Sequence, residues 1–322
     1  MQLTENEQKL LDDLIQNVLG AWSRHHEQVP HVLYHYTSAD GLIGRLSSKS
    51  IWLTDLRYMN DLSELQYSKA LVEKRLALQL EAPGLSDIQK TFIRRIGTSF
   101  DPFHAGYSVF SASFCEEGNL LSQWRAYRGR GGGYAIGFDF FHLLRLLSRH
   151  CVLRRVMYGE SEQVTVIDSV IKEFLRVLDN DENKLLNLKE TESSFLPALC
   201  QAFSSTIGEL MFSFKHPDFK EEREWRLVHF ASASPTSHRG NDLPKFRSYD
   251  GNIIPYYTVQ LDKAIALSLE DTYGYAFPVV ELMIGPTINA DLNQESVKLL
   301  LLSLNPDIAP KISRSGIPLR WL

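Results

Sequence analysis

Cysteine is scarce in this chain, with three residues in 322, and they stand far apart at Cys115, Cys151 and Cys200. None belongs to a Cys-x-x-Cys pair, so the spacings of zinc fingers and dithiol redox motifs are absent. An odd number of widely separated cysteines is typical of a reducing compartment rather than of a disulfide framework. We therefore expect a cytoplasmic protein with free thiols.

Long hydrophobic runs are also missing. No stretch of about 18 apolar residues occurs, so we expect no membrane-spanning helix, and the polar start MQLTENEQKLLDDL does not resemble a signal peptide. The net charge of -5 argues against a protein that coats nucleic acid, although it leaves room for a local basic groove.

The signatures of metal sites and of serine hydrolases are absent as well. The sequence contains no His-Glu-x-x-His and no Cys–His pairing, and no Gly-x-Ser-x-Gly elbow surrounds Ser111 or Ser113. The glycines between residues 129 and 133 form neither a Gly-x-Gly-x-x-Gly nor a Walker loop. We therefore expect no bound metal.

What is present is an irregular succession of helical and strand patterns. Residues 4–26 carry an apolar stripe at helical spacing, and Thr4 with Glu7 has the spacing of a capping box. The pattern of residues 160–214 is helical throughout. Further strands are expected at 31–37, 51–54, 107–114, 134–138, 224–230, 253–261, 279–284 and 317–319, and further helices at 39–46, 62–80, 86–97, 119–127 and 291–303.

Strands in this number and at this irregular spacing favour an α+β fold over a regular doubly wound one. We expect an N-terminal helix within residues 1–30, followed by a single α+β domain over residues 31–322. The helical segment at about 160–214 is interpreted as an insertion into that domain.

The most informative segment is KEEREWRLV, at residues 220–228. If it is a strand, Glu222, Glu224 and Arg226 share one face, because side chains alternate. Two carboxylates one strand step apart repel each other unless solvent or a ligand relieves them. They are candidate site residues; the alternative is a solvated strand face with Arg226 as counter-ion.

Two further segments present polar side chains at strand positions. The run YHYTS, from Tyr34 to Ser38, combines a polar ring and hydroxyls with a helix start, which suits a ribose or phosphate. The alternative is a helix cap beside a half-buried histidine. Ser111 and Ser113 point to one face of a strand, where they can bind a sugar hydroxyl or orient a carboxylate.

The segment QWRAYRGRGGG, at residues 123–133, combines two arginines with several glycines. Glycine allows a backbone to approach a ligand closely, and Arg128 and Arg130 are suited to bind phosphate. A flexible connector between a helix and a strand is the alternative interpretation.

Several spaced motifs carry a family resemblance: HYTS, NDLSE, SASF, LSQWRAY, YAIGFD, FKEEREWRL, MIGP and IPLR, in this order. Together they resemble the bacterial family called domain of unknown function 2971 over roughly residues 31–320. This layout also looks like the ADP-ribosyltransferase fold, with a split mixed or antiparallel sheet. His35 then matches the first motif of that fold, Ser111 with Ser113 the second, and Glu222-Arg223-Glu224 the third.

The resemblance implies roles in the chemistry of NAD+ as substrate. Glu224 would bind the ribose next to nicotinamide and stabilise positive charge in an oxocarbenium-like transition state. Glu222 would orient or deprotonate the acceptor, and Ser111 and Ser113 would position Glu224. The residues expected to bind NAD+ are His35 and Thr37 at the adenosine ribose, Tyr36 or Tyr127 on nicotinamide, and Arg128 or Arg130 at the diphosphate.

Three functions remain open at this point. The first is an ADP-ribosyltransferase or NAD+ glycohydrolase acting as a bacterial toxin or phage-defence effector, with a nucleic-acid or protein acceptor and a cognate antitoxin or defence partner. The second is a non-catalytic nucleotide- or nucleic-acid-binding module, because a histidine first motif and Ser-x-Ser normally occur separately. The third is a metal-dependent nuclease, which requires Asp61, Glu64, Glu222 and Glu224 to converge.

Overall fold

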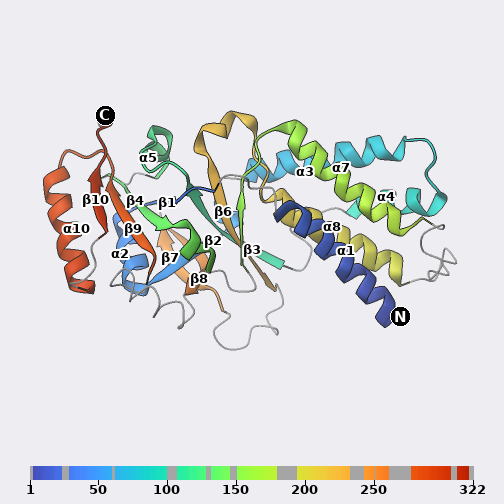
Figure 1. Ribbon diagram of the computed structural model, residues 1–322, viewed down its shortest axis with the longest axis horizontal. Helices are drawn as coiled ribbons and strands as arrows, with labels where there is room; N and C mark the ends of the chain where they lie inside the picture. The colour runs from blue at the N-terminus through green and yellow to red at the C-terminus, as the bar shows by residue number, and fades with distance from the viewer. Residues whose placement is uncertain are drawn as a thin grey trace. The chain divides into compact units, whose positions relative to one another are not determined.

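The computed structural model (Figure 1) describes most of the chain. The described residues are 3–23, 29–59, 62–99, 107–127, 132–145, 151–179, 194–232, 243–249, 251–260, 277–305 and 310–318. Their helices and strands fall into two compact units, a helical unit and a sheet unit, and each is built from segments that alternate along the sequence. Because of this alternation, each unit closes only after distant parts of the chain have come together.

Five helices of the described residues make up the helical unit. The first begins at a capping box, in which the Thr4 backbone nitrogen donates to Glu7 Oε2 at 2.8 Å and the Glu7 nitrogen donates to Thr4 Oγ1 at 3.3 Å. The expected capping box is thereby confirmed. The helices are α1 (Glu5–Ser23), α3 (Leu62–Leu80), α4 (Asp87–Ser99), α7 (Glu160–Val177) and α8 (Phe195–Met211).

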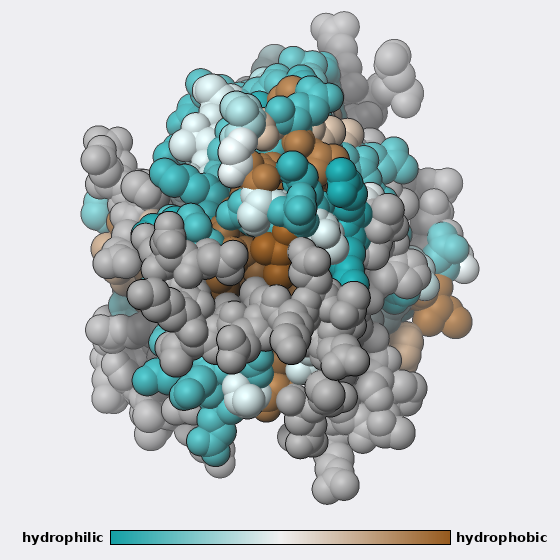
Figure 2. Space-filling model, turned by 90° about the vertical axis from the view of Figure 1, so that its right-hand side faces the viewer, coloured by the Kyte–Doolittle hydropathy of each residue, from teal (hydrophilic) through white to brown (hydrophobic). Residues whose placement is uncertain are grey.

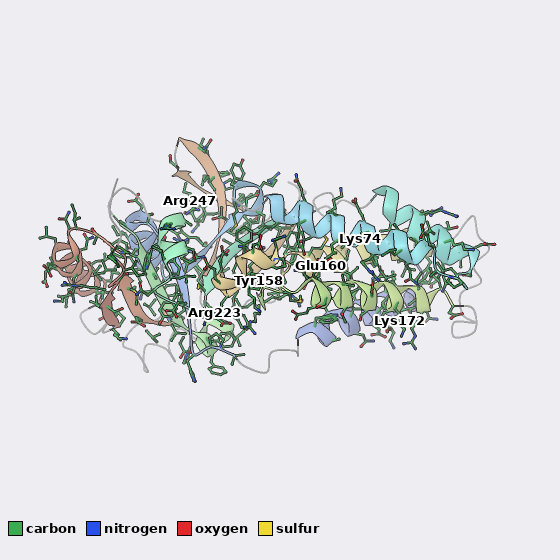
Figure 3. All side chains as sticks on the ribbon, turned by 90° about the horizontal axis from the view of Figure 1, so that it is seen from above. Lys74, Tyr158, Glu160, Lys172, Arg223 and Arg247 are labelled. Carbon is green, nitrogen blue, oxygen red and sulfur yellow. The ribbon has the colours of Figure 1, made fainter. Side chains whose placement is uncertain are left out.

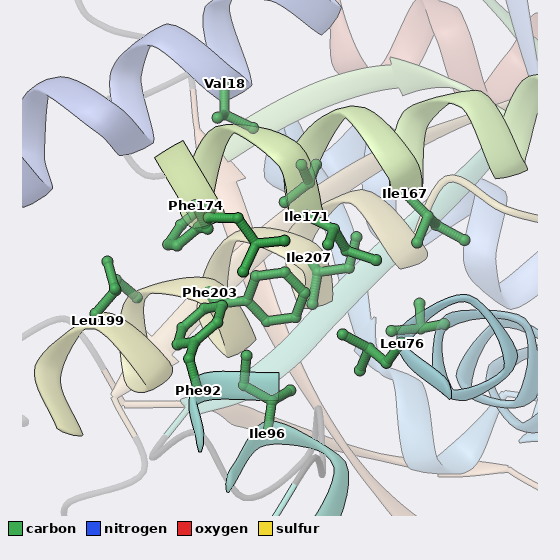
Figure 4. Packing of buried hydrophobic residues seen from close by; sticks show 14 of the residues in the cluster. Val18, Leu76, Phe92, Ile96, Ile167, Ile171, Phe174, Leu199, Phe203 and Ile207 are labelled. Carbon is green, nitrogen blue, oxygen red and sulfur yellow. The ribbon is translucent and has the colours of Figure 1, made fainter. Parts of the chain in front are cut away.

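Three phenylalanines lie in the core of the helical unit (Figure 4). Phe92 of α4 stacks on Phe174 of α7, with ring centroids 6.4 Å apart, and both meet the ring of Phe203 of α8 edge to face. The three side chains are fully buried. Aromatic packing therefore joins helices that are far apart in the sequence.

The surface in Figure 2 is mainly hydrophilic in its described part, with hydrophobic residues visible between polar ones. No helix within the described ranges combines the length and apolar character needed to cross a membrane. The three cysteines are free thiols, and burial raises the pKa of Cys115 to about 12 and that of Cys200 to about 11.

The sheet unit is built around a mixed open sheet, so the expected combination of helices with a mixed sheet is confirmed. The central strands run in the order β10-β9-β4-β1-β3-β2-β8-β7, and β6 pairs with both β3 and β5. Strands β9 and β10 are parallel, whereas β1 is antiparallel to both β3 and β4. The strands are β1 (Val32–Thr37), β2 (Ser50–Asp55), β3 (Tyr107–Cys115), β4 (Tyr134–Asp139), β5 (Cys151–Arg155), β6 (Glu224–Ser232), β7 (Lys245–Tyr249), β8 (Asn252–Gln260), β9 (Val279–Ile284) and β10 (Lys311–Arg314).

The two faces of this sheet are packed differently. One face bears a large hydrophobic cluster that includes Leu42 and Leu46 of α2, and the other bears a small cluster around Tyr36 and Trp124. The described helices of this unit are α2 (Ala39–Ser48), α5 (Leu121–Tyr127), α6 (Phe140–Arg145) and α10 (Ala290–Leu304). The short 3-10 turn η1 (Leu56–Tyr58) follows β2 in the sequence, and η2 (Pro217–Glu222) precedes β6.

The structure differs from the sequence prediction in three strands. The last strand is β10, at Lys311–Arg314, and not at residues 317–319, of which residues 317 and 318 have no regular structure. Strands β5 and β7 were not expected, because both are short and each contains arginine among few apolar residues. Pairing with β6 and β8 respectively, rather than an alternating pattern, holds these two strands in place.

Candidate functional site in the sheet unit

Three of the predicted site residues share one face of the sheet. Ser111 and Ser113 alternate along β3 with residues of the large hydrophobic cluster, and Glu224 alternates in the same way with Trp225 on β6. Strands β3 and β6 are paired. The two hydroxyls and the carboxylate therefore lie on the face opposite the large cluster. The hydroxyl oxygens of both serines are buried and have no hydrogen-bond partner among the described residues.

Glu224 forms a buried ion pair with Arg226 on the same strand. Arg226 Nε donates to Glu224 Oε1 at 2.7 Å, and Arg226 Nη2 donates to Oε2 at 3.0 Å. Glu224 is 4% exposed and Arg226 is 3% exposed. Arg226 is therefore the counter-ion of the carboxylate, but the strand face that they share is buried rather than solvated.

Glu222 does not share this strand face. It ends the turn η2, and Arg223, which separates it from Glu224, has a left-handed backbone with φ of 40°. Glu222 and Glu224 therefore do not lie on one strand, which was the condition for them to share a face, because β6 begins only at Glu224, where the strand was expected. The Glu222 carbonyl accepts a hydrogen bond from Cys115 Sγ at 2.9 Å, which ties the turn to the end of β3.

His35 lies where β1 meets β3. Its Nδ1 is 2.8 Å from the carbonyl oxygen of Ser113, and because a carbonyl only accepts, Nδ1 carries the hydrogen. Desolvation lowers the pKa of His35 well below its ordinary value, and the nearby charges of Arg45 and Arg247 act in the same direction. The ring is therefore neutral at pH 7, and its Nε2 is a hydrogen-bond acceptor.

The two residues after His35 have structural partners. The Tyr36 hydroxyl donates to the carbonyl of Glu117 at 2.7 Å and accepts from the backbone nitrogen of Leu120 at 2.9 Å, and its ring meets Trp124 at 4.7 Å. Thr37 Oγ1 accepts a hydrogen bond from Arg45 Nη1 at 3.2 Å. These contacts hold the Tyr36 side chain of β1 against the start of α5. Because its ring already packs on Trp124, it is poorly placed to stack on a ligand.

The remaining predicted residues lie at or beyond the end of α5. Tyr127 is the last residue of that helix, and only its backbone is described. Arg128 and Arg130 lie outside the described residues. Asp61 also lies outside them, whereas Glu64 belongs to the helical unit and forms an ion pair with Lys215 at 2.9 Å. Within the described ranges, no group of three or more histidine, cysteine, aspartate or glutamate side chains is arranged to hold a metal ion.

Two arginines near His35 were not predicted from the sequence. Arg45 lies on α2, and Figure 3 labels Arg247, which lies on β7. A signal for Arg45 exists, because it stands within the apolar stripe of the helix, three residues after Leu42 and next to Leu46. No comparable signal marks Arg247, since its strand was not expected.

The comparison with known families gives one match. The family model described as protein of unknown function (DUF2971) matches residues 123–227, from α5 to β6, which confirms the family resemblance seen in the sequence. The matched stretch includes Glu222 and Glu224 but neither His35 nor the serines of β3. No curated protein and no solved structure matches the chain significantly.

Proposed function

We propose that this member of the DUF2971 family cleaves NAD+ at its nicotinamide bond and transfers ADP-ribose to an acceptor or to water. The observation that carries the proposal is the common face of Ser111, Ser113 and Glu224 on two paired strands. A carboxylate and two hydroxyls on rigid strands form a fixed polar surface, which suits the hydroxyl groups of a ribose.

Glu224 is the residue proposed to act on the ribose next to nicotinamide. When the bond from C1′ to the nicotinamide nitrogen breaks, its electron pair leaves with nicotinamide and positive charge develops on the ribose. A fixed carboxylate stabilises that charge. Arg226 donates to both oxygens of Glu224 and so fixes the orientation of the carboxylate that would face the ribose.

His35 and Glu222 are assigned supporting roles. The neutral His35 ring offers Nε2 as an acceptor to a hydroxyl of the adenosine ribose. Glu222, partly exposed at the end of η2, would remove the proton from the nucleophilic atom of the acceptor as this atom attacks C1′.

The acceptor would be a nucleic acid, a protein side chain or water. We extend the proposal to a biological role as a toxin or phage-defence effector, with a cognate antitoxin or defence partner.

A second candidate function rests on the same ion pair. Because both oxygens of Glu224 are bound by Arg226, a nucleotide-binding module without turnover is also consistent with this geometry. This module would bind nucleotide through the same strands and would not consume NAD+. Its function would survive replacement of Glu224 by a neutral residue that keeps the fold.

The test is NAD+ consumption by purified protein, with and without bacterial lysate, followed by detection of transferred ADP-ribose. We expect Glu224→Gln to abolish turnover and Glu221→Gln, a change at an exposed neighbouring carboxylate, to leave it unchanged. Because Glu224→Gln leaves Arg226 without its counter-ion, Ser113→Ala serves as a second variant that keeps the ion pair; it should reduce turnover. No NAD+ consumption by folded wild-type protein would overturn the enzyme and favour the binding module.

A further inference from the structure

Arg45 is a buried cation that forms no ion pair with a carboxylate of the described residues. It is 3% exposed, and its Nη1 donates to Thr37 Oγ1 and to the Gly41 carbonyl, both at 3.2 Å. Its Nε has no hydrogen-bond partner in the part of the chain that the structure describes. Burial and the charge of Arg247 lower the pKa of Arg45 to about 9, so the guanidinium stays charged at neutral pH. A buried charge that is only partly bonded destabilises the fold unless something offsets it.

Arg247 brings a second positive charge to the same place. Its Nη2 donates to Thr54 Oγ1 at 2.9 Å, and its charge also opposes protonation of His35. No carboxylate within the described part of the chain is among the groups that shift the pKa of Arg45 or of His35. Among the described groups, Arg45 and Arg247 thus place two positive charges near each other, an arrangement that favours an anionic ligand.

Two aromatic rings fix the positions of the arginines. The guanidinium of Arg45 lies 5.0 Å from the centre of the Trp52 ring, and that of Arg247 lies 6.0 Å from the centre of the Tyr256 ring. Trp52 and Tyr256 are themselves in contact, with ring centroids 4.9 Å apart. The two arginines are thus held on adjoining supports, which limits the entropy that they would lose on binding a ligand.

A hydroxyl donor completes the set. Ser111 on β3 lies directly opposite Thr54 on β2, so the two side chains point to the same face of the sheet. Ser111 is 1% exposed and its hydroxyl has no partner within the described ranges, although Thr54 beside it receives the hydrogen bond from Arg247. The Ser111 hydroxyl is thus a buried donor close to the Arg247 guanidinium, and an acceptor atom of a ligand would satisfy it.

We propose that Arg45, Arg247 and Ser111 form a binding site for a phosphate group. Two guanidinium groups and a hydroxyl supply more donors than a single carboxylate can accept, whereas a phosphate has several acceptor oxygens and up to two charges. The same chemistry is found in inorganic phosphate, in pyrophosphate and in the phosphates of a nucleotide. The inference shares Ser111 with the proposed NAD+ site but requires no role for Glu224, so the two proposals can fail separately.

The experiment measures binding of pyrophosphate, ADP and adenosine to the full-length protein by calorimetry at low salt, together with the shift in melting temperature. We expect the wild type to bind pyrophosphate and ADP but not adenosine. Arg45→Gln and Arg247→Gln should each weaken binding about 10-fold or more, since a charge-assisted bond contributes roughly 1.5–3 kcal/mol. Arg176→Gln removes an exposed arginine of the helical unit and should leave the affinity unchanged.

Ser111→Ala provides a variant that keeps both arginines, in case Arg45→Gln does not fold; it should weaken pyrophosphate binding several-fold. Equal affinity for pyrophosphate and ADP would show that the phosphates alone are recognised, and tighter binding of ADP would show that a nucleotide is the ligand. Absence of binding to the wild type, or equal binding by folded Arg45→Gln and Arg247→Gln proteins, would overturn the proposal. NAD+ turnover that persists in those variants would leave the proposed enzyme standing while this inference fails.

Discussion

Arg226, two residues after Glu224 on the same strand, donates hydrogen bonds to both of its carboxylate oxygens, and neither residue is more than 4% exposed. Breaking a buried pair by removing one partner leaves an uncompensated charge, which destabilises a protein by about 3–5 kcal/mol. We expect Arg226→Met to lower the free energy of unfolding by about this amount, as measured by urea denaturation.

The double variant Glu224→Met with Arg226→Met is the control for that measurement. Apolar residues of similar length remove both charges together, so the double variant should recover most of the lost stability. If Arg226→Met and the double variant are equally unstable, the ion pair does not account for the effect. The comparison separates the electrostatic contribution of the pair from the packing of the two stems.

His35 predicts how stability depends on pH. Because the folded state holds this imidazole neutral, its pKa is lowered, and below about pH 6.5 the unfolded chain binds a proton that the folded chain does not. The His35 contribution to stability is therefore complete above this pH and declines as pH falls, by up to about 1.4 kcal/mol per pH unit. His35→Asn should flatten the pH dependence of the unfolding free energy between pH 7 and 5, and an unchanged pH dependence in this variant would contradict the prediction.

Local pattern was sufficient for β1 and β3. In both strands, apolar residues alternate with polar ones, and the alternation correctly placed Ser111 and Ser113 on one face. The side-chain environments of Tyr36 and Glu224 could not be predicted in this way. The environment of Tyr36 depends on its hydrogen bonds to the backbone of residues 117 and 120. That of Glu224 depends on the burial of Arg226 beside it.

The arginines show a second limit of sequence analysis. Arg45 and Arg247 are far apart in the chain, and they come close because β2 pairs with both β3 and β8 while β7 pairs with β8. Strand order of this kind is set by tertiary packing and leaves no short-range signal. A site made by such pairing is recognised only when the structure shows the two guanidinium groups and the Ser111 hydroxyl close together.

Gly41 predicts a steric requirement beside Arg45. A Cβ atom at Gly41 would overlap Thr37 Oγ1 and lie 2.8 Å from Arg45 Nη1. We therefore expect Gly41→Ala to displace the guanidinium and to destabilise the protein by about 1–3 kcal/mol, the range typical of overpacking. Gly97→Ala in α4 meets no atom within 4 Å and should instead stabilise by about 0.5–1 kcal/mol, because alanine favours helix. Equal effects of the two changes on the unfolding free energy would contradict this prediction.

Arg223 predicts a stabilising substitution next to the candidate catalytic carboxylate. Its backbone φ of 40° lies in the left-handed region, where a Cβ atom costs about 1–2 kcal/mol, and glycine avoids that cost although it increases the entropy of the unfolded chain. The Arg223 side chain is exposed, so its removal should have little effect of its own. We expect Arg223→Gly to raise the free energy of unfolding by up to about 1 kcal/mol, and Arg223→Ala, which keeps the Cβ atom, to leave it nearly unchanged.

If the strained turn serves to position Glu222, Arg223→Gly will also reduce NAD+ turnover, while Arg223→Ala will preserve it. Loss of stability in Arg223→Gly relative to Arg223→Ala would show that the left-handed conformation carries no strain.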